Sequence, residues 1–325
     1  MAQAPKQVKI LVPGNQPMVA LLGHRDELLR LIESAFDTHI LVRGNEITIT
    51  GEDEEAQKAA LLFEELLTIL STGQVLNPEA VGRTIDMIKT EEGKPSEVLT
   101  DPVVTSRGKS IAPKTVGQKR YVDAIRKATV TFAVGPAGTG KTYQAVATAV
   151  KALQERSVSR IILTRPAVEA GERLGFLPGT LYEKIDPYLK PLYDALYEML
   201  DADAFQRFME RGTIEVAPLA FMRGRTLNDS FIILDEAQNT TPEQMKMFLT
   251  RLGFGSKVVV NGDVTQIDLP TGQRSGLMVV EEILQDIEGI EFIQLGARDV
   301  VRHKIVQDIV EAYRVYGDRR ARAGE

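Results

Sequence analysis

The first 85 residues alternate between short strand-like runs and helical stretches of apolar positions. Runs at 7–12, 39–42 and 46–50 have the pattern of strands, and a Gly-Asn pair between the last two indicates a hairpin. Apolar residues recur at helical spacing over 25–36 and 54–70. This segment is therefore predicted to be a small α+β domain with its helices packed on one face of the strands.

From residue 113 onward, continuous runs of Val, Ile and Leu alternate with helical stretches. Such runs are expected for strands that are buried on both faces of a parallel sheet. One helix, 241–252, has a full start signal in Thr241, Pro242 and Gln244. The pattern predicts a three-layer α/β domain with a mostly parallel sheet. The candidate strands are 129–134, 160–164, 213–216, 231–234, 257–261 and 291–295.

Residues 86–112 show neither pattern. They contain Pro95 and Pro102 among Thr, Ser, Lys and Glu residues, with little apolar periodicity. Such a composition is typical of a linker. The predicted organisation is a small domain over 1–85, a linker over 86–112 and an α/β domain over 113–325.

The composition excludes several kinds of chemistry. The chain of 325 residues has no cysteine, which rules out disulfides, Cys-ligated zinc, iron–sulfur clusters and thiol catalysis. Its three histidines, His24, His39 and His303, are too scattered for a histidine-based metal site. No apolar run reaches the roughly 18–20 residues of a membrane helix, and the N-terminus does not resemble a signal peptide. We expect a soluble, cytoplasmic protein without membrane contact.

The net charge is −6, from 39 Lys and Arg against 45 Asp and Glu. Residues 1–85 alone carry seven basic and twelve acidic side chains, a net charge of −5. Nucleic-acid-binding surfaces are usually basic, so this balance counts against such a surface on the N-terminal domain. The total charge does not decide the partner.

A glycine-rich segment carries the strongest chemical signal. Residues 135–142 read Gly-Pro-Ala-Gly-Thr-Gly-Lys-Thr and match Gly-x4-Gly-Lys-Ser/Thr between a predicted strand and a predicted helix. Glycines let backbone N–H groups point at a phosphate, and the helix N-terminus adds a positive dipole end. We expect Lys141 to contact the β- and γ-phosphates and Thr142 to bind Mg2+. The predicted nucleotide-binding residues are Gly135, Pro136, Ala137, Gly138, Thr139, Gly140, Lys141 and Thr142.

Two carboxylates follow the predicted strand 231–234. Asp235 is expected to lie beside the phosphate loop, where it holds Mg2+ through water. Glu236 is then placed to polarise the attacking water as a general base. The alternative is an ordinary strand that ends in a polar turn, and the phosphate loop in the same domain favours the catalytic interpretation.

Two glutamines are further candidates. Gln266, after the predicted strand 257–261, is placed to bond the γ-phosphate or the attacking water. The amide of Gln118 is able to pair with adenine N6 and N7, and the Asn-Lys-x-Asp motif that selects GTP is absent. Taken alone, a polar turn explains Gln266 better, and an exposed polar loop explains Gln118 better.

The order of these motifs resembles that of superfamily 1 helicases. More narrowly, the string 165–179 together with 235–239 resembles the PhoH-like family of bacterial ATPases, over about residues 110–316. The resemblance implies an ATP-binding protein with one RecA-like domain, in a family linked to phosphate starvation and RNA metabolism. The helicase-like order comprises Gln118, 135–142, Thr164-Arg165-Pro166, 235–238 and 262–266.

The resemblance extends to a KH-like N-terminal domain. In RNA-binding KH domains a Gly-x-x-Gly loop clamps the nucleotides. Residues 23–26 read Gly-His-Arg-Asp instead. This departure argues against RNA binding by the N-terminal domain.

The size of the chain implies an oligomer. Superfamily 1 helicases close a cleft between two RecA-like domains, whereas residues 113–325 suffice for one. We therefore expect a homo-oligomeric ring, with a hexamer as the candidate size and ATP at subunit junctions. Arg302 resembles the helicase arginine that touches the γ-phosphate, and Arg298 precedes it by four residues on the same predicted helix face. Arg274 is a weaker candidate, and a solvated polar face is the alternative.

Four arginines and two phenylalanines are candidates for contact with single-stranded nucleic acid. They lie in or beside loops at the carboxyl ends of predicted strands, where ligands meet open α/β sheets. Surface solvation explains the arginines equally well. These residues are Arg165, Arg173, Arg223, Arg225, Phe176 and Phe221.

Together these features predict a Mg2+-dependent ATPase whose hydrolysis drives RNA remodelling, as a helicase or translocase. Its catalytic residues would be Lys141, Glu236, Gln266 and Arg302. An ATP-gated oligomeric switch that recruits a nuclease or ribosome-maturation partner is the first alternative. A P-loop kinase is the second. Glu236 directly after Asp235 argues against a kinase, because a base that activates water wastes ATP there.

Overall fold

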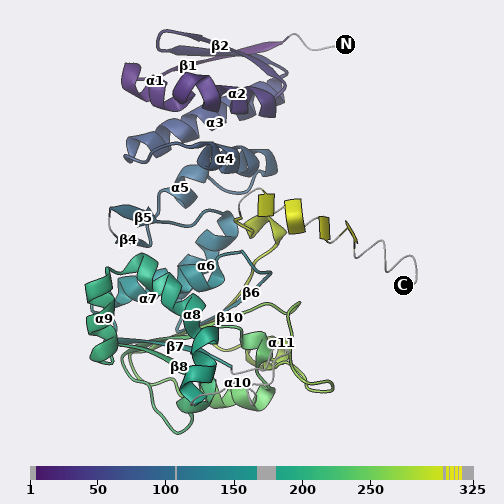
Figure 1. Cartoon of the computed structure of the whole chain (residues 1–325). Helices are drawn as coiled ribbons and strands as arrows, with labels where there is room; N and C mark the ends of the chain where they lie inside the picture. The colour runs from purple at the N-terminus through teal and green to yellow at the C-terminus, as the bar shows by residue number, and fades with distance from the viewer. Residues whose placement is uncertain are drawn as a thin grey trace. The chain divides into compact units, whose positions relative to one another are not determined.

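Figure 1 shows the computed structural model of the chain. The chain divides into two compact units, Met1–Lys119 and Arg120–Glu325, and helix α6 (Val116–Lys127) crosses the division. The structure describes residues 5–106, 108–166, 181–302, 305–306, 308–310, 312–313 and 315–316.

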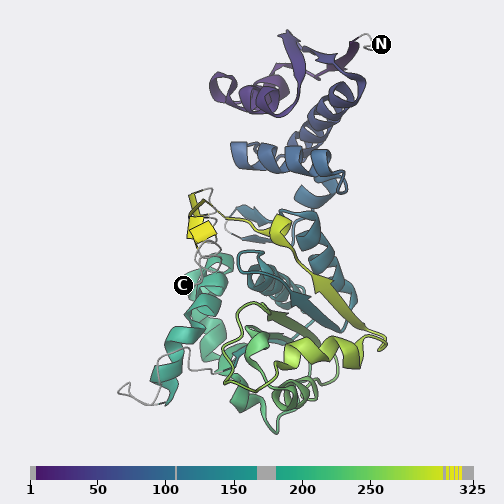
Figure 2. The same ribbon diagram turned by 90° about the vertical axis from the view of Figure 1, so that its right-hand side faces the viewer.

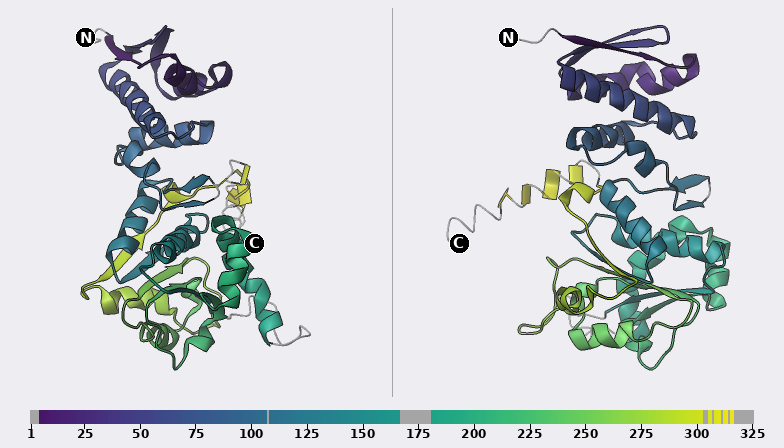
Figure 3. Two further views of the ribbon diagram at one scale, coloured as in Figure 1. Left: turned by 90° about the vertical axis from the view of Figure 1, so that its left-hand side faces the viewer. Right: turned by 180° about the vertical axis from the view of Figure 1, so that it is seen from behind.

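The first unit contains a three-stranded antiparallel sheet in the order β1-β3-β2. Helices cover one face of it (Figure 3), and Leu28, Ile47 and Phe63 are buried in the shared core. The α+β class predicted for this segment is confirmed, while its likeness to KH domains stays a prediction. The elements are β1 (Lys6–Leu11), α1 (Asn15–Leu22), η1 (His24–Asp26), α2 (Glu27–Ala35), β2 (Thr38–Arg43), β3 (Glu46–Gly51) and α3 (Asp53–Ser71).

Two helices and a hairpin follow in the first unit, where the sequence predicts a linker from residue 86. Pro78 and Pro95 lie in the first turns of the helices, where the missing N–H of proline leaves no hydrogen bond unmade. Buried Val81 and Ile85 join the core of the unit, in which α4 packs on α2 and α3. The prolines therefore begin helices, and the domain limits at 85 and 112 stay predictions. The elements are α4 (Pro78–Thr90), α5 (Pro95–Leu99), β4 (Val104–Ser106) and β5 (Lys109–Ile111).

The second unit is built on a six-stranded sheet whose neighbouring strands are all parallel, in the order β11-β6-β10-β9-β7-β8. Helices lie on both sides of the sheet (Figures 1 and 2). All six predicted strands are present, and the predicted α/β class with a RecA-like P-loop domain is confirmed. The strands are β6 (Val130–Val134), β7 (Arg160–Arg165), β8 (Ile214–Pro218), β9 (Ser230–Leu234), β10 (Lys257–Gly262) and β11 (Ile290–Gln294).

Apolar side chains pack the helices of this unit against the sheet. Met245 of α10 and Leu277 of α11 share a buried cluster with Phe132 and Val260 of the sheet. Helix α7 packs on β7, β9 and β10. The remaining elements are α7 (Lys141–Gln154), α8 (Leu181–Met199), α9 (Ala202–Glu210), η3 (Leu219–Met222), η4 (Ala237–Asn239), α10 (Pro242–Leu249), α11 (Gly276–Leu284) and η5 (Ala297–Asp299).

Helix α10 begins as its sequence predicts and ends earlier. The hydroxyl of Thr241 accepts from the Gln244 N–H at 3.3 Å, and the Gln244 side chain accepts from the Thr241 N–H at 2.9 Å. The helix ends at Leu249 rather than at residue 252, because Leu252 forms a β-bridge with Leu227.

The predicted helix face with Arg298 and Arg302 is wrong. Arg298 lies in the short η5, and the backbone is extended at Val300. The Val301 N–H donates to the carbonyl oxygen of Gly138 at 2.9 Å. This N–H group is therefore not available for the hydrogen bond within a helix that the prediction requires.

The register of the sheet brings several strand ends to one edge. Gly262 pairs with Val134, and Leu234 lies between Val260 and Thr164. The segments that leave β6, β7, β9 and β10 therefore start side by side, at the edge where open α/β sheets bind ligands. None of the helices among the described residues is long and apolar enough to cross a membrane.

Candidate nucleotide-binding site

The loop between β6 and α7 has the backbone conformation of a phosphate-binding loop. Gly138 and Gly140 adopt φ values of 87° and 78°, a region that residues with a Cβ rarely occupy. The buried Thr139 hydroxyl donates to the Pro136 carbonyl oxygen at 2.9 Å and closes the turn. Helix α7 begins at Lys141, so its free N–H groups face the interior of the loop.

Residues at the ends of two neighbouring strands contact the first residue of this loop. The Gly135 N–H donates to the carbonyl oxygen of Gly262 at 3.1 Å. A Cβ on Gly135 would lie 2.5 Å from the carbonyl oxygen of Leu295, so this position requires glycine.

Lys141 folds back over the loop. Its ammonium donates to the carbonyl oxygens of Gly135 and Pro136 at 2.6 and 2.9 Å. Burial lowers the pKa of Lys141, and the negative charges of Asp263, Asp235 and Glu236 oppose that shift. A cation with these neighbours is placed to move from carbonyl oxygens to a phosphate.

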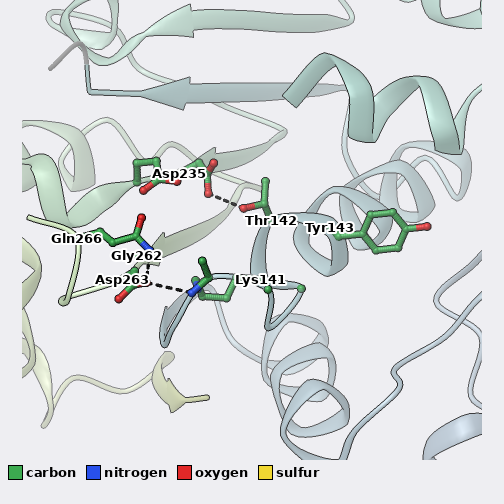
Figure 4. A pocket seen from close by; sticks show the side chains of 11 residues that line it. Lys141, Thr142, Tyr143, Asp235, Gly262, Asp263 and Gln266 are labelled. Carbon is green, nitrogen blue, oxygen red and sulfur yellow. Dashed lines mark hydrogen bonds between the residues drawn. The ribbon is translucent and has the colours of Figure 1, made fainter. Parts of the chain in front are cut away.

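Thr142 and Asp235 meet across the site. The Thr142 hydroxyl donates to the Asp235 carboxylate at 2.6 Å, as Figure 4 shows. Asp235 directly follows β9 and has only 2% of its surface exposed. The structure therefore brings together the two oxygen ligands that the sequence predicts for Mg2+.

Glu236 is next to this pair but is held by other side chains. Its backbone has a φ of 54°, an uncommon value for a residue with a Cβ. Arg165 donates to Oε1 at 3.1 Å, and Gln238 donates to Oε2 at 2.6 Å. Arg165 also contacts Asp235 Oδ2, 2.7 Å from its Nη2.

Asp263 is a site residue that the sequence reasoning missed. Its carboxylate accepts from the Ala137 N–H at 3.0 Å and from the Gln266 side chain at 2.8 Å. Burial would raise the pKa of Asp263, but hydrogen bonds from Thr265 and the charge of Lys141 outweigh it and lower that pKa. The available signal was a carboxylate directly after a buried strand at the edge that also holds the loop.

Arg302 reaches the phosphate loop of its own chain. Its guanidinium donates to the carbonyl oxygen of Ala137 and lies where a Cβ on Gly138 would point. The predicted proximity to the site is thus present, while contact with a γ-phosphate stays a prediction.

Gln118 lies at the start of α6 in the first unit. Its side-chain oxygen accepts from the Lys114 N–H at 2.8 Å, and the residue is buried. The exposed loop offered as the alternative is therefore wrong, and adenine recognition by Gln118 stays a prediction.

The other arginines have separate surroundings. Arg225 makes a two-pronged pair with Glu215 at 2.6 and 2.8 Å. Phe221 is 36% exposed, and Arg223 and Arg274 are exposed. Arg173 and Phe176 lie outside the described residues.

Most of these site residues line one cavity of about 280 Å³. This volume lies just below the roughly 300–1,000 Å³ typical of ligand pockets, so the cavity suits phosphate groups better than a whole nucleotide. Tyr143 points from α7 away from the carboxylates in Figure 4. Burial, aided by Glu198, raises its pKa to about 12. The cavity is lined by Ala137, Gly138, Gly140, Lys141, Thr142, Tyr143, Asp235, Glu236, Gly262, Asp263 and Gln266.

Within the described part of the chain, no three His, Cys, Asp or Glu side chains form a metal-binding group. A single hydroxyl and a single carboxylate are nevertheless the usual protein ligands of Mg2+ that is bound mainly through phosphates and water. The Thr142–Asp235 pair matches that set.

Comparison with known proteins agrees with this geometry. A family model described as PhoH-like protein matches residues 110–314. A PhoH-like protein of Mycobacterium tuberculosis is 59% identical over 317 residues, which cover 97% of this chain and 90% of that protein. A PhoH-like protein of Bacillus subtilis is 54% identical over 297 residues, with 91% and 93% covered.

A solved structure of a Sulfolobus solfataricus SWI2/SNF2 ATPase core in complex with dsDNA aligns with a TM-score of 0.34 and 14% identity. It covers 55% of this chain and 43% of that chain, and this low likeness adds nothing to the assignment. The family model and the close relatives are decisive, and the chain belongs to the PhoH-like protein family.

Proposed function

We propose that this protein is a Mg2+-dependent ATPase. The observation that carries the proposal is the convergence of one phosphate loop, one Thr–Asp pair and one adjacent glutamate on a single cavity. A P-loop fold alone serves many chemistries. A carboxylate next to the metal-binding aspartate adds the base that hydrolysis requires.

Each residue has a role that follows from its position. Lys141 and the loop N–H groups stabilise charge on the phosphoryl oxygens. Thr142 and Asp235 hold Mg2+, which supplies further neutralisation of phosphate charge when bound. Glu236 accepts the proton of the attacking water, and Gln266 contacts the γ-phosphate after its amide leaves Asp263.

The proposal also covers the process that ATP hydrolysis drives. The helicase-like order of the motifs supports RNA remodelling or translocation along a single strand. We propose a homo-oligomeric ring of the hexamer type in the cytoplasm, with ATP at subunit junctions. Light scattering that finds a monomer both with and without ATP would reject the ring.

The ATP-gated switch remains the competing function. The observation that favours it is Glu236, whose two carboxylate oxygens are both held in the structure. Such a site turns over slowly until something releases the glutamate. Nucleotide-dependent binding of a nuclease or ribosome-maturation partner, without duplex unwinding, would favour this function over remodelling.

Glu236→Gln tests the proposed mechanism. ATP binding is expected to survive, while turnover falls about 100-fold or more, as expected for loss of a general base. Binding is measured by equilibrium titration and turnover by phosphate release. Turnover equal to that of the wild type would reject Glu236 as the base.

A further inference from the structure

Arg165 is the last residue of β7 and lies between two acidic side chains. Its Nε is 2.9 Å and its Nη2 2.7 Å from Oδ2 of Asp235, and the same Nη2 is 3.1 Å from Oε1 of Glu236. The arginine side chain is 16% exposed, so water screens these contacts only in part. One guanidinium thus holds both the metal-binding carboxylate and the proposed base.

Gln238 holds Glu236 from the other side. Its amide donates to Oε2 of Glu236 at 2.6 Å and lies 3.1 Å from the carbonyl oxygen of Gln266. Its side-chain oxygen accepts from the Asp263 N–H at 3.0 Å, and the residue is fully buried. Gln238 is therefore held by three hydrogen bonds, whereas the Arg165 side chain is 16% exposed, so Arg165 is the partner of Glu236 that an incoming anion is able to reach.

We propose that Arg165 is a positioning residue that holds Glu236 in the resting site, and that a phosphate oxyanion frees the glutamate by taking over the guanidinium. This inference rests on the proposed hydrolysis with Glu236 as base. A guanidinium binds phosphate oxygens through the same planar fork that binds carboxylates. Phosphate and Glu236 therefore compete for one group.

Two sources supply such an oxyanion at this edge of the sheet. One is the γ-phosphate of ATP, because Asp235 and the phosphate loop line the same cavity. The other is the backbone of a nucleic-acid strand, because β7 ends where ligands of open α/β sheets bind. Both act on Arg165 by the same chemistry, and the experiment distinguishes them.

The test uses Arg165→Lys and Arg165→Gln in the full chain. Lysine keeps the charge but lacks the fork that spans both carboxylates. We expect Arg165→Lys to raise ATP hydrolysis without RNA about fivefold, which is the effect of weakening one partly screened ion pair. Arg165→Gln removes the positive charge next to Asp235, so Mg2+ no longer competes with the guanidinium for that carboxylate and is expected to bind there more tightly. The Mg2+ concentration that half-saturates binding of a fluorescent ATP analogue should then fall about fivefold.

Folding is controlled separately, because loss of Arg165 leaves the buried Asp235 without an ionic partner. Thermal unfolding is compared with that of Arg225→Gln, which breaks the pair with Glu215 away from the cavity. A larger loss of stability in Arg165→Gln than in this control is expected. If Arg165→Gln does not fold, Arg165→Lys decides the proposal.

Single-stranded RNA identifies the source of the oxyanion. If the strand frees Glu236, RNA stimulates the wild type but not Arg165→Lys; if ATP itself does, both respond equally. Slower or unchanged hydrolysis by Arg165→Lys would overturn the proposal, whatever the Mg2+ requirement of Arg165→Gln. Wild-type hydrolysis no faster than that of Lys141→Ala would instead reject the proposed function.

Discussion

At the scale of single residues, the site is an arrangement of carboxylates that accept hydrogen bonds from neighbouring side chains and backbone N–H groups. Thr142 and Arg165 satisfy Asp235, and Arg165 and Gln238 satisfy Glu236. Asp263 accepts hydrogen bonds from the loop N–H of Ala137 and from the side-chain amide of Gln266. Under the proposed mechanism, the Thr142–Asp235 bond is exchanged for contacts with Mg2+, and the Arg165–Glu236 bond for contacts with phosphate.

Asp263 gives a prediction about pH. Its pKa is lowered in the folded chain, so its contribution to stability is complete above the unfolded value of about 3.9 and is lost as the pH falls through the folded value. We expect Asp263→Asn to melt at a lower temperature than the wild type near neutral pH. The difference should shrink below about pH 4. Melting curves at several pH values measure it, and a difference independent of pH would contradict the prediction.

The sequence predicted residue types well and residue pairs poorly. The carboxylates of Asp235 and Glu236 follow a strand, so their place at the sheet edge follows from position along the chain. The contact of Arg165 with both of them depends on β7 lying next to β9, which no local pattern reveals. The bond between Asp263 and the Ala137 N–H was unpredictable for the same reason, since the two residues are 126 positions apart.

At the scale of elements, the strands were predictable because they are buried on both faces and form continuous apolar runs. Helix α1 was missed, because its eight residues include Pro17 and are too short for a clear period. Arg298 and Arg302 were placed on one helix face, although a backbone bond to Gly138 draws the chain away from helical geometry. Contacts between distant segments overrode local preference in that case.

A lysine caps helix α6, and its removal is expected to destabilise the second unit. Lys257, at the start of β10, donates to the carbonyl oxygens of Ile125, Arg126 and Ala128 at 3.0, 3.1 and 2.6 Å. Lys257→Met should lower the free energy of unfolding by about 1–2 kcal/mol, since a charged donor at a helix C-terminus is lost. Urea unfolding measures the change. Lys246→Met on the exposed side of α10 is the control, and an equal effect of both would contradict the role of the cap.

Two glycine substitutions are expected to act in opposite directions. Gly135→Ala places a Cβ 2.5 Å from the carbonyl oxygen of Leu295, so β11 or the loop has to shift and both stability and nucleotide binding should fall. Gly82 lies within α4, and a Cβ added at this position would meet no atom of the described residues beyond the local helix backbone within 4 Å, so Gly82→Ala fits without a clash. It should gain about 0.5–1 kcal/mol, because alanine is the better helix former. Thermal unfolding of both variants checks the signs, and a stabilised Gly135→Ala would contradict the tight packing.

At the scale of the whole molecule, the residues that line the candidate site all belong to the second unit, which contains most of the segment that matches the family model. The helicase-like motif order and the single RecA-like domain lead to the proposed ring. The class of both units followed from hydrophobic periodicity. The helical structure of 86–99 did not, because a proline that begins a helix, as Pro95 does, resembles a proline of a linker when the packing partners are unknown.

The most direct test of the account is steady-state phosphate release from ATP by the wild type and by Lys141→Ala, each with and without single-stranded RNA. The account predicts Mg2+-dependent release by the wild type, faster with RNA, and none above background for Lys141→Ala. Release that is indifferent to RNA would shift the function to the ATP-gated switch. Wild-type release equal to that of Lys141→Ala would contradict the central claim that this cavity hydrolyses ATP.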